Sequence, residues 1–477
     1  MSSFPSTLFA GQRFAVLGLG RNGLPAVCAL ARGGATVQAW DDGEAARAAL
    51  AKAVTTLPPE AAARISCAPF TDLAGTDGLV LSPGIPHLLP SPHPVAVMAR
   101  EAGVPILSDA ELLYRAVRKA GSKARFVGIT GTNGKSTTTT LLAHVLAEAG
   151  VPVAAGGNLG PAALALPLLP DNGVYVLEMS SYMLERLDTL RFDAACLLNL
   201  TPDHLDRHAG MEGYARAKTR VFTGQTAQDL AVIGTDDPWC QDIARTLQAG
   251  PAHCLTISGT NPACDVYGQT DASGTGIWQA GRCLAHSGPS LPGSHNAENA
   301  AAVCAMAGFL GVPDAVLAAA ILSFPGLPHR QKLVAQHAGV AFIDDSKATN
   351  ADASARALGC YDRLIWIAGG MAKEGGIASL APYFPRIIHA FLIGRDAPQL
   401  AETLTAHGVP FTCSGTLEEA VPAAYDAARN TGTPVVLLSP ACASFDQFSG
   451  FEARGLRFLE LARTVTEQPQ TGTGKAD

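Results

Sequence analysis

The stretch RFVGITGTNGKSTTTTLLAHVL, residues 125–146, decides how the rest of the chain is interpreted. Its first six residues form an apolar run that predicts a buried β-strand, and its last six carry apolar side chains at helical spacing. Between them, Gly131 and Gly134 predict a tight turn. A strand, a glycine-rich turn and a helix in this order are typical of a phosphate-binding loop, because backbone N–H groups and the partial positive charge of the helix N-terminus converge on phosphate oxygens.

The residues that follow this turn predict binding of a nucleoside triphosphate. Lys135 would reach the β- and γ-phosphates, and the hydroxyl of Ser136 or Thr137 would hold Mg²⁺. Ile129 stands where the strict phosphate-loop pattern has its first glycine, so a glycine-rich turn before an ordinary helix is the alternative interpretation. The strand before the turn and the apolar helix face after it favour a nucleotide.

A second glycine-rich turn follows an apolar strand at residues 13–17. Its glycines at positions 18, 20 and 23 match the dinucleotide-binding fingerprint, with Asp41 or Asp42 about 20 positions later. Two interpretations stay open: a turn that needs glycine only for packing, and a site for a nucleotide diphosphate without hydride chemistry. A fingerprint beside a separate phosphate loop favours two bound nucleotides over a single dehydrogenase cofactor.

Short β-rich runs alternate with helical patterns along the whole chain, which is typical of parallel α/β layers. The length of 477 residues predicts about three domains, at roughly 150 residues each. Residues 254–290 predict a small β excursion, and residues 324–328 are a Pro/Gly-rich hinge candidate. The polar C-terminal end, residues 466–477, is expected to be a disordered tail.

Composition and charge exclude several classes of protein. The 34 Lys+Arg and 41 Asp+Glu residues give a net charge of −7, which argues against a nucleic-acid binder with a broad basic face. The eleven cysteines are scattered and show no CxxC pair, which favours a reduced cytoplasmic protein over a disulfide scaffold or a structural zinc site. No secretory signal opens the sequence and no apolar run is long enough to span a bilayer, so we expect no membrane insertion.

Polar residues follow several other predicted strands, at the end where open α/β sheets place ligands. The Glu178 carboxylate could hold Mg²⁺ directly or through water. Residues 203–208 offer His and Asp side chains as metal ligands, although a polar loop is the favoured interpretation, and Lys218 taken alone predicts a solvated helix lysine. Three further polar clusters, at residues 328–330, 344–350 and 439–444, predict either a ligand cleft or ordinary polar turns.

These strings, in this order, resemble the ATP-dependent Mur ligases of peptidoglycan synthesis from about Phe14 to Leu461. The phosphate loop is shared with the wider ligase family, including folylpolyglutamate synthase. The more discriminating strings are GGNLG at 156–160, GLPHR at 326–330 after Phe324, DSKATN at 345–350, and SPACAS with DQF between 439 and 448. The nearest alternative is another ligase of this family that adds a different amino acid, or glutamate to folate, and the strings at 324–330 and 439–448 speak against it. A dehydrogenase would leave Lys135 without a role. A non-catalytic nucleotide-binding module is the third alternative.

The resemblance implies an α/β protein of three domains. A Rossmann-like N-terminal domain at 1–113 would bind the UDP sugar, a P-loop ATPase domain at 114–325 would be central, and a Rossmann-like domain at 326–465 would bind the amino acid. The implied activity is the ATP-dependent addition of D-glutamate to UDP-N-acetylmuramoyl-L-alanine through an acyl phosphate. These small-molecule substrates are the implied partners of a cytoplasmic protein, which we expect to be a monomer.

The resemblance also implies ATP and two Mg²⁺ ions as cofactors. Ser136 and Glu178 would hold one ion, and His204 with Lys218 would hold the other. Lys218 would act as its N-carbamate, since a free ammonium cannot coordinate Mg²⁺, whereas added CO₂ provides the anionic oxygen that this ion prefers. The implied catalytic residues are Lys135, Glu178, His204 and Lys218.

Substrate contacts follow from the resemblance position by position. ATP contacts are implied for Gly131, Thr132, Asn133, Gly134, Lys135, Ser136, Thr137, Asn296, Asn299, Arg330, Asp345 and Lys347. UDP-sugar contacts are implied for Gly18, Gly20, Asp42, Ser82, Gly84, Asn158 and His204. Glutamate contacts are implied for Thr349, Lys373, Ser444 and the backbone of Phe451.

Overall fold

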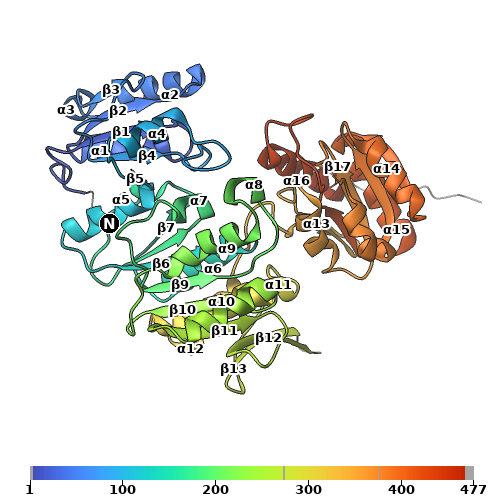
Figure 1. Ribbon diagram of the computed structural model, residues 1–477. Coiled ribbons are helices and arrows are strands. Elements are labelled where there is room, and N and C mark those ends of the chain that lie inside the picture. Colours follow the sequence, from blue (N-terminus) through green and yellow to red (C-terminus); the bar gives the residue numbers. More distant parts are fainter. Residues whose placement is uncertain (1–3, 272–273, 374, 468–477) are drawn as a thin grey trace, which may run out of the picture. The chain divides into compact units, whose positions relative to one another are not determined.

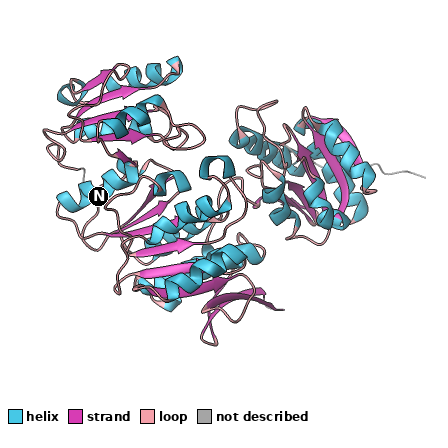
Figure 2. Ribbon diagram, viewed as in Figure 1, coloured by secondary structure: helices cyan, strands magenta, loops and turns pink. Residues whose placement is uncertain are grey.

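The computed structural model describes residues 4–271, 274–373 and 375–467 (Figure 1). Two compact units divide the described chain: one runs up to Ser287 and includes Asn296–Phe324, and the other holds residues 288–295 and the chain from Pro325 onward. Strands alternate with helices along the chain, as the sequence predicts, and the mostly parallel strands form three sheets (Figure 2). The domain boundaries at 113/114 and 325/326 stay predictions.

The first sheet has five parallel strands in the order β3-β2-β1-β4-β5. Alternate residues of β1 and β4 belong to two separate hydrophobic clusters, with Val16 and Val80 in one and Ala15 and Leu79 in the other. Both faces of the sheet are therefore covered, as in doubly wound folds. The elements are β1 (Arg13–Leu17), α1 (Gly23–Arg32), β2 (Thr36–Trp40), α2 (Glu44–Val54), α3 (Pro59–Ala62), β3 (Ile65–Cys67), β4 (Gly78–Leu81), α4 (Pro94–Glu101), β5 (Ile106–Leu107) and α5 (Asp109–Lys119).

The second sheet has nine strands in the order β14-β13-β12-β11-β10-β9-β6-β8-β7. Its parallel part includes β6, which confirms the strand predicted before the phosphate loop. The antiparallel pairs β12–β13 and β13–β14 confirm the predicted β excursion. The strands are β6 (Arg125–Thr130), β7 (Val153–Gly157), β8 (Val174–Glu178), β9 (Ala194–Leu197), β10 (Leu230–Gly234), β11 (His253–Ser258), β12 (Val266–Asp271), β13 (Gly274–Gln279) and β14 (Arg282–His286).

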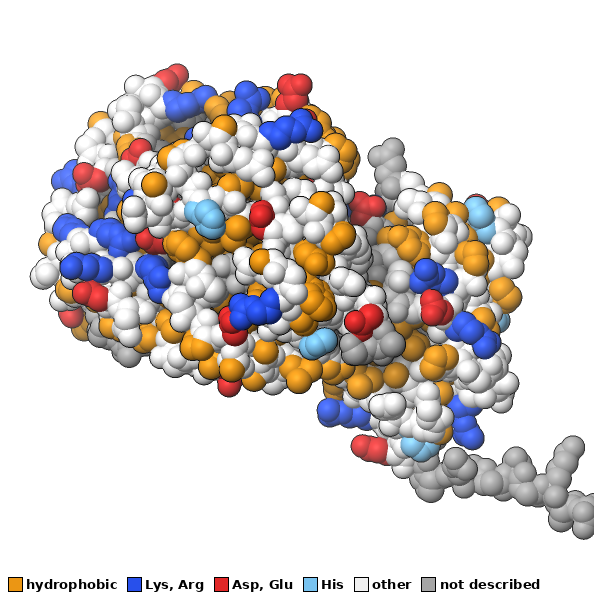
Figure 3. Space-filling view, turned by 90° about the horizontal axis from the view of Figure 1, so that it is seen from below, with side chains coloured by type: hydrophobic (Ala, Val, Ile, Leu, Met, Phe, Trp, Pro, Cys, Tyr) orange, Lys and Arg blue, Asp and Glu red, His pale blue; other side chains and the backbone are white. Residues whose placement is uncertain are grey.

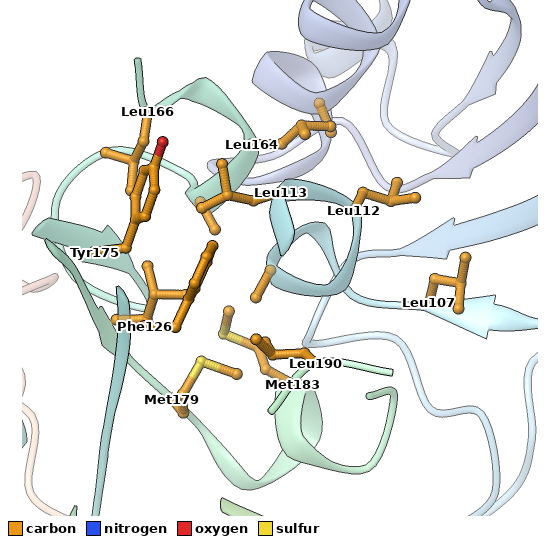
Figure 4. Close-up of a cluster of buried hydrophobic side chains, with 14 of the residues drawn as sticks. Leu107, Leu112, Leu113, Phe126, Leu164, Leu166, Tyr175, Met179, Met183 and Leu190 are labelled. Carbon is orange, nitrogen blue, oxygen red and sulfur yellow. The ribbon is translucent and has the colours of Figure 1, made fainter. Parts of the chain in front are cut away.

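Helices cover the second sheet and join its core to that of the first. The helix predicted after the phosphate loop is α6 (Lys135–Glu148), and its predicted apolar face is fully buried, made by Leu141, Leu142, Val145 and Leu146. In Figure 4, Leu113 of α5 lies toward Phe126 of β6 and Tyr175 of β8, while Leu112 lies on the other side of α5, toward Leu107 of β5. All five belong to one hydrophobic cluster. The other helices of this part are η1 (Ala163–Ala165), α7 (Ser181–Leu184), α8 (Leu205–His208), α9 (Met211–Thr219), η2 (Arg220–Phe222), α10 (Pro238–Gln248), α11 (Ser294–Phe309) and α12 (Asp314–Ser323).

The third sheet has six strands in the order β15-β16-β20-β17-β18-β19, and all its pairs are parallel except β15–β16. Hydrophobic clusters lie on both of its faces. Its elements are β15 (Lys332–His337), β16 (Val340–Asp344), α13 (Ala351–Leu358), β17 (Leu364–Gly369), η3 (Ala378–Arg386), β18 (Ile387–Ile393), α14 (Ala397–Ala406), β19 (Phe411–Gly415), α15 (Leu417–Thr431), β20 (Val435–Leu438) and α16 (Phe451–Glu467).

The C-terminal end corrects one prediction. Thr466 and Glu467 are the last residues of α16, so the predicted disordered tail is wrong for these two, and residues 468–477 lie outside the described residues. All eleven cysteines are free thiols, as predicted. Figure 3 shows basic and acidic side chains interspersed over much of one face, in keeping with the small net charge. Among the described helices, none combines the length and the apolar character needed to cross a bilayer.

Candidate active site

The phosphate loop is the turn between β6 and α6, and neighbouring elements hold it. The φ angles of Gly131 and Gly134 are +146° and +84°, a region that side-chain-bearing residues rarely adopt. Asn199, just after β9, accepts hydrogen bonds from the backbone N–H groups of Thr132 and Asn133 at 2.9 Å each. A Cβ atom on Gly134 would overlap Oδ1 of Asn299 on α11. The loop is therefore fixed from two sides before any ligand binds.

Two lysine ammonium groups meet at this loop. Lys135 Nζ donates to the carbonyl oxygens of Gly131 and Thr132 at 2.8 Å each, and Lys218 Nζ donates to the same Gly131 oxygen at 2.8 Å. Lys218 lies on the predicted helix, α9, but it is only 2 % exposed. The interpretation of a solvated lysine is wrong, because the side chain points inward to the end of β6. Burial, and then the charge of Lys135, hold the pKa of Lys218 well below its usual value.

Glu178 ends β8, beside the phosphate loop. β8 pairs with β6 on one side and β7 on the other, with Glu178 opposite Ile129 and Gly157. Its carboxylate is 2 % exposed, and Oε1 accepts a hydrogen bond from Asn158 Nδ2 at 2.7 Å. Oε2 is buried, and no described residue donates a hydrogen bond to it. A buried carboxylate oxygen without a donor indicates a bound partner from outside the chain, and Mg²⁺ takes such hard oxygen ligands. Ser136 is also buried, and its hydroxyl offers a second hard oxygen ligand for Mg²⁺.

The loop at residues 203–208 does not form a metal centre by itself. Within the described chain, no three His, Cys, Asp or Glu side chains gather closely enough to hold an ion. His208 is buried instead and contacts Ser181 and Glu185, at 2.9 Å and 3.2 Å. His204 is half exposed, has a φ of +52° and lies 3.5 Å from Asp203, while burial lowers its pKa. A second cation would therefore need a further oxygen ligand, which an N-carbamate on Lys218 would provide.

The first glycine-rich turn, between β1 and α1, is closed by neighbouring side chains. Ser82 Oγ donates to the Gly18 carbonyl at 2.9 Å, and the Leu19 N–H donates to Asp41 Oδ2 at 2.7 Å. The acidic residue on the turn is thus Asp41, whereas Asp42 is exposed and accepts from Trp40 Nε1. Gly20 and Gly84 are exposed, so a ligand could approach their backbone.

Two residues that the sequence analysis missed form hydrogen bonds between this part of the first sheet and segments around the second sheet. The buried Asp109 accepts hydrogen bonds from Asn22 Nδ2 at 3.2 Å and from the Ala163 N–H at 2.8 Å, and burial raises its pKa. Arg186 donates to the carbonyl oxygens of Leu81 and Ile85 at 2.6 Å and 2.7 Å, around the Ser82 turn. No pattern in the sequence marked either residue, because their partners lie 54 to 105 positions away.

Predicted ATP-binding residues also occur in the second unit, at the ends of its strands. Asp345 is buried and accepts from Ser439 Oγ at 2.7 Å and from the Gln331 N–H at 3.2 Å. Burial raises the pKa of Asp345 to about 7, opposed by Ser439 and by the charge of Arg330. Lys347 Nζ lies 4.7 Å from the centre of the Phe451 ring. The predicted ATP residues Asn296 and Asn299 belong to the first unit, where they hydrogen-bond each other at 3.1 Å.

The predicted glutamate contacts gather at one edge of the third sheet. Met371 and Ala443 form a two-residue bridge, which brings the segment of Lys373 beside that of Ser444. The Phe451 carbonyl accepts a hydrogen bond from Ser346 Oγ at 2.9 Å, three residues before Thr349. Ser444 is buried, Thr349 is half-buried and Lys373 is exposed.

Comparison with known proteins shows the family of the chain. The model of the Mur ligase middle domain matches residues 129–307, and that of the Mur ligase glutamate ligase domain matches residues 329–442. The chain is 50 % identical to the UDP-N-acetylmuramoylalanine–D-glutamate ligase of Paramagnetospirillum magneticum, covering 96 % of this chain and 98 % of that one. It is 47 % identical to the enzyme of the same name from Rhodospirillum rubrum, covering 96 % and 95 %.

A solved structure supports the fold. The UDP-N-acetylmuramate-alanine ligase MurC of Thermotoga maritima matches with a TM-score of 0.59 and 18 % identity, covering 95 % of this chain and 99 % of that one. At this identity the likeness concerns the fold alone, whereas the sequence relatives concern the family. The chain belongs to the Mur ligase family of ATP-dependent enzymes that form carbon–nitrogen bonds.

Proposed function

We propose that the protein adds D-glutamate to UDP-N-acetylmuramoyl-L-alanine through an acyl-phosphate intermediate, as a step of peptidoglycan precursor synthesis. The observation that carries this proposal is the meeting of Lys135, Lys218 and the unpartnered Oε2 of Glu178 at the ends of β6 and β8. The names of the relatives supply the substrate class. The predicted division into 1–113, 114–325 and 326–465 is part of the proposal, with one substrate assigned to each domain.

The first step joins two anions, so the site must neutralise charge. The terminal carboxylate of the acceptor attacks the γ-phosphorus of ATP, and the bond to the bridging oxygen breaks, which releases ADP. Lys135 would turn from the loop carbonyls to the phosphate oxygens and stabilise the charge that develops on them. Bound Mg²⁺ would supply further electrostatic stabilisation, held by Ser136 and Glu178 at one position and by His204 with modified Lys218 at the other.

The surroundings of Lys218 suit carbamate formation. Its lowered pKa leaves a larger fraction of neutral amine than an exposed lysine would have. The neutral nitrogen attacks the carbon of CO₂, one N–H proton leaves to solvent, and an anionic carbamate remains. The N–H that stays on the carbamate nitrogen would keep one of the hydrogen bonds that Nζ donates to the Gly131 carbonyl and the Thr130 hydroxyl.

The second step needs a site for the amino acid. The proposed contacts Thr349, Lys373 and Ser444 share the edge of the third sheet with the N-terminus of α16 at Phe451. A carboxylate is favoured at a helix N-terminus by the helix dipole and the backbone N–H groups. The amine of glutamate then attacks the carbonyl carbon of the acyl phosphate, and inorganic phosphate leaves.

The nucleotide part of the acceptor is assigned to the first glycine-rich turn, with Gly18, Gly20, Asp42, Ser82 and Gly84 as its proposed contacts. Asn158 would lie near the muramoyl part, since its side chain already contacts Glu178. We also propose a cytoplasmic location, where ATP and nucleotide sugars are available. The monomeric state stays a prediction.

Product analysis tests this function. The purified protein is incubated with ATP, Mg²⁺, UDP-N-acetylmuramoyl-L-alanine and either D- or L-glutamate, and the products are separated and weighed by mass spectrometry. We expect the glutamyl product with D-glutamate only. A product with L-glutamate only, or with a different amino acid, would contradict the assigned substrate.

The carbamate role has its own test. Replacing Lys218 by alanine should abolish ligation, and a short added carboxylate such as acetate should restore part of it by occupying the place of the carbamate. Lys119→Ala, at the end of α5, serves as the control. Normal activity of Lys218→Ala without any additive would show that no carbamate is needed.

A further inference from the structure

Arg454 is a buried cation on α16 that the function described so far does not use. It is 1 % exposed, although it lies on the first turn of a helix at the edge of the third sheet. Burial lowers its pKa to about 10, so it stays positively charged near neutral pH. A buried guanidinium is costly unless its donors are paired, so its partners indicate why it is kept there.

The guanidinium donates to three separate loops. Nη2 and Nε contact the carbonyl oxygen and the hydroxyl of Ser346, at 2.8 Å and 3.0 Å. Nη1 contacts the carbonyl oxygens of Cys442 at 3.1 Å and of Gly369 at 3.4 Å. These partners lie 12 to 108 positions from Arg454 in the sequence, so one planar side chain joins the loops after β16, β17 and β20.

Each of these loops carries one of the proposed glutamate contacts. Thr349 follows Ser346 by three residues, Lys373 follows Gly369 by four, and Ser444 follows Cys442 by two. The fourth contact, Phe451, precedes Arg454 by one helical turn, and its carbonyl accepts from the hydroxyl of Ser346. All four segments of the proposed pocket therefore meet at one side chain.

We infer that Arg454 is a positioning residue for the incoming amino acid. It holds the three loops and the start of α16 in one arrangement, so that the groups that bind the glutamate carboxylates keep their spacing. The inference rests on the proposed function, because the glutamate contacts are themselves proposed. Lysine cannot replace arginine here, since a single ammonium group lacks the planar fork that reaches acceptors on three loops at once.

Substrate-specific kinetics test this inference. Arg454→Lys should raise the KM for D-glutamate by about 10-fold or more, because small displacements of binding groups have large effects on a positioned substrate. The KM for the acceptor should stay within about twofold of the wild type, because its proposed contacts lie in the first unit, and the KM for ATP should rise less than that for D-glutamate. Arg457→Lys is the matched control, since Arg457 lies one turn further along α16 and, among the described residues, has the exposed Glu418 and Glu460 as its ion-pair partners.

Chemical rescue separates positioning from stability. Arg454→Ala should lose D-glutamate affinity, and added guanidinium ion should restore it by occupying the space left by the side chain, whereas ammonium ion should not. If Arg454→Lys and Arg454→Ala do not fold, Ser346→Ala provides the test, because it removes the hydroxyl that joins Arg454 to Phe451. It should raise the same KM by a smaller factor.

Two results would overturn the inference. One is an unchanged KM for D-glutamate in Arg454→Lys, or in Ser346→Ala where that variant is used. The other is an equal loss for all three substrates together with a lower melting temperature, which indicates a structural role only. Failure of the proposed function is a different result, because the wild type itself would then form no glutamyl product.

Discussion

The two glycine-rich turns of the first unit share a plan but differ in their surroundings. Each joins a buried strand to a helix, β1 to α1 and β6 to α6, and each has a glycine near φ +85°, Gly18 at +88° and Gly134 at +84°. At the first turn, the Asp41 carboxylate accepts a hydrogen bond from the Leu19 N–H. At the second turn, the ammonium groups of Lys135 and Lys218 both donate hydrogen bonds to the Gly131 carbonyl.

This difference shows what a glycine pattern does and does not determine. The glycines set the path of the backbone, because a Cβ atom at Gly18 or Gly134 would overlap Ser82 or Asn299. The side chains at the ends of the neighbouring strands set the charge that a ligand meets. The two ammonium groups suit the second turn to a triphosphate, whereas a carboxylate, that of Asp41, closes the first.

The largest expected effect is the loss of the cation on the second turn. Lys135→Ala should lower kcat by about 10²–10³-fold, because a group that stabilises developing charge is removed. Steady-state ligation rates check this. Lys123→Ala, an exposed lysine just before β6, should behave like the wild type. Unchanged turnover in Lys135→Ala would remove this residue from the mechanism.

Removing the acid at each turn should have different effects on the Mg²⁺ concentration that the enzyme needs for activity. Glu178→Gln keeps an acceptor for Asn158 but removes the charge, so the Mg²⁺ concentration for half-maximal activity should rise by about 10- to 100-fold. Asp41→Asn, whose carboxylate serves the backbone of its own turn, should leave that concentration unchanged. A magnesium titration of both variants checks the pair, and equal titration curves would contradict the assignment of the metal to Glu178.

The first turn should be sensitive to packing at one glycine and tolerant at another. A Cβ atom on Gly23 would overlap the Gly18 carbonyl, so Gly23→Ala should lower the free energy of unfolding by about 1–3 kcal/mol. A Cβ atom on Gly20 meets nothing within 4 Å among the described residues. Gly20→Ala should therefore change the free energy of unfolding by less than about 0.5 kcal/mol. Denaturant unfolding measures both, and the KM of Gly20→Ala for the acceptor then reports whether the nucleotide approaches this position. Equal stability losses would show that the turn is not packed as described.

A third strand-end acid, Asp345 of the second unit, should give the smallest effect. Its pKa is raised to about 7 by burial, against about 3.9 in the unfolded chain. Between these values the unfolded state ionises first, so the free energy of unfolding of the ligand-free protein should fall as the pH rises. Asp345→Asn should remove this part of the pH dependence in denaturant unfolding, and an unchanged slope would show that Asp345 is ionised throughout the range.

The sequence predicted the parts of the site that depend on neighbouring residues. The strand, turn and helix around Lys135 are local, as is Glu178 at the end of an apolar run. β7 was missed, because Val153–Gly157 consists mainly of Ala and Gly and lacks a strand-like apolar signal. The burial of Lys218 and Arg454 could not be predicted, since most of their hydrogen-bond partners lie about 85 to 110 positions away.

The most direct test of the central claim is ADP release measured with each substrate omitted in turn. If the turn before α6 holds ATP so that a carboxylic acid is activated, ADP should form only when the UDP-N-acetylmuramoyl-L-alanine acceptor is present. Sustained release should also require D-glutamate, with one ADP formed per ligated product. ADP release at the same rate without the acceptor, or none with all three substrates present, would contradict the account.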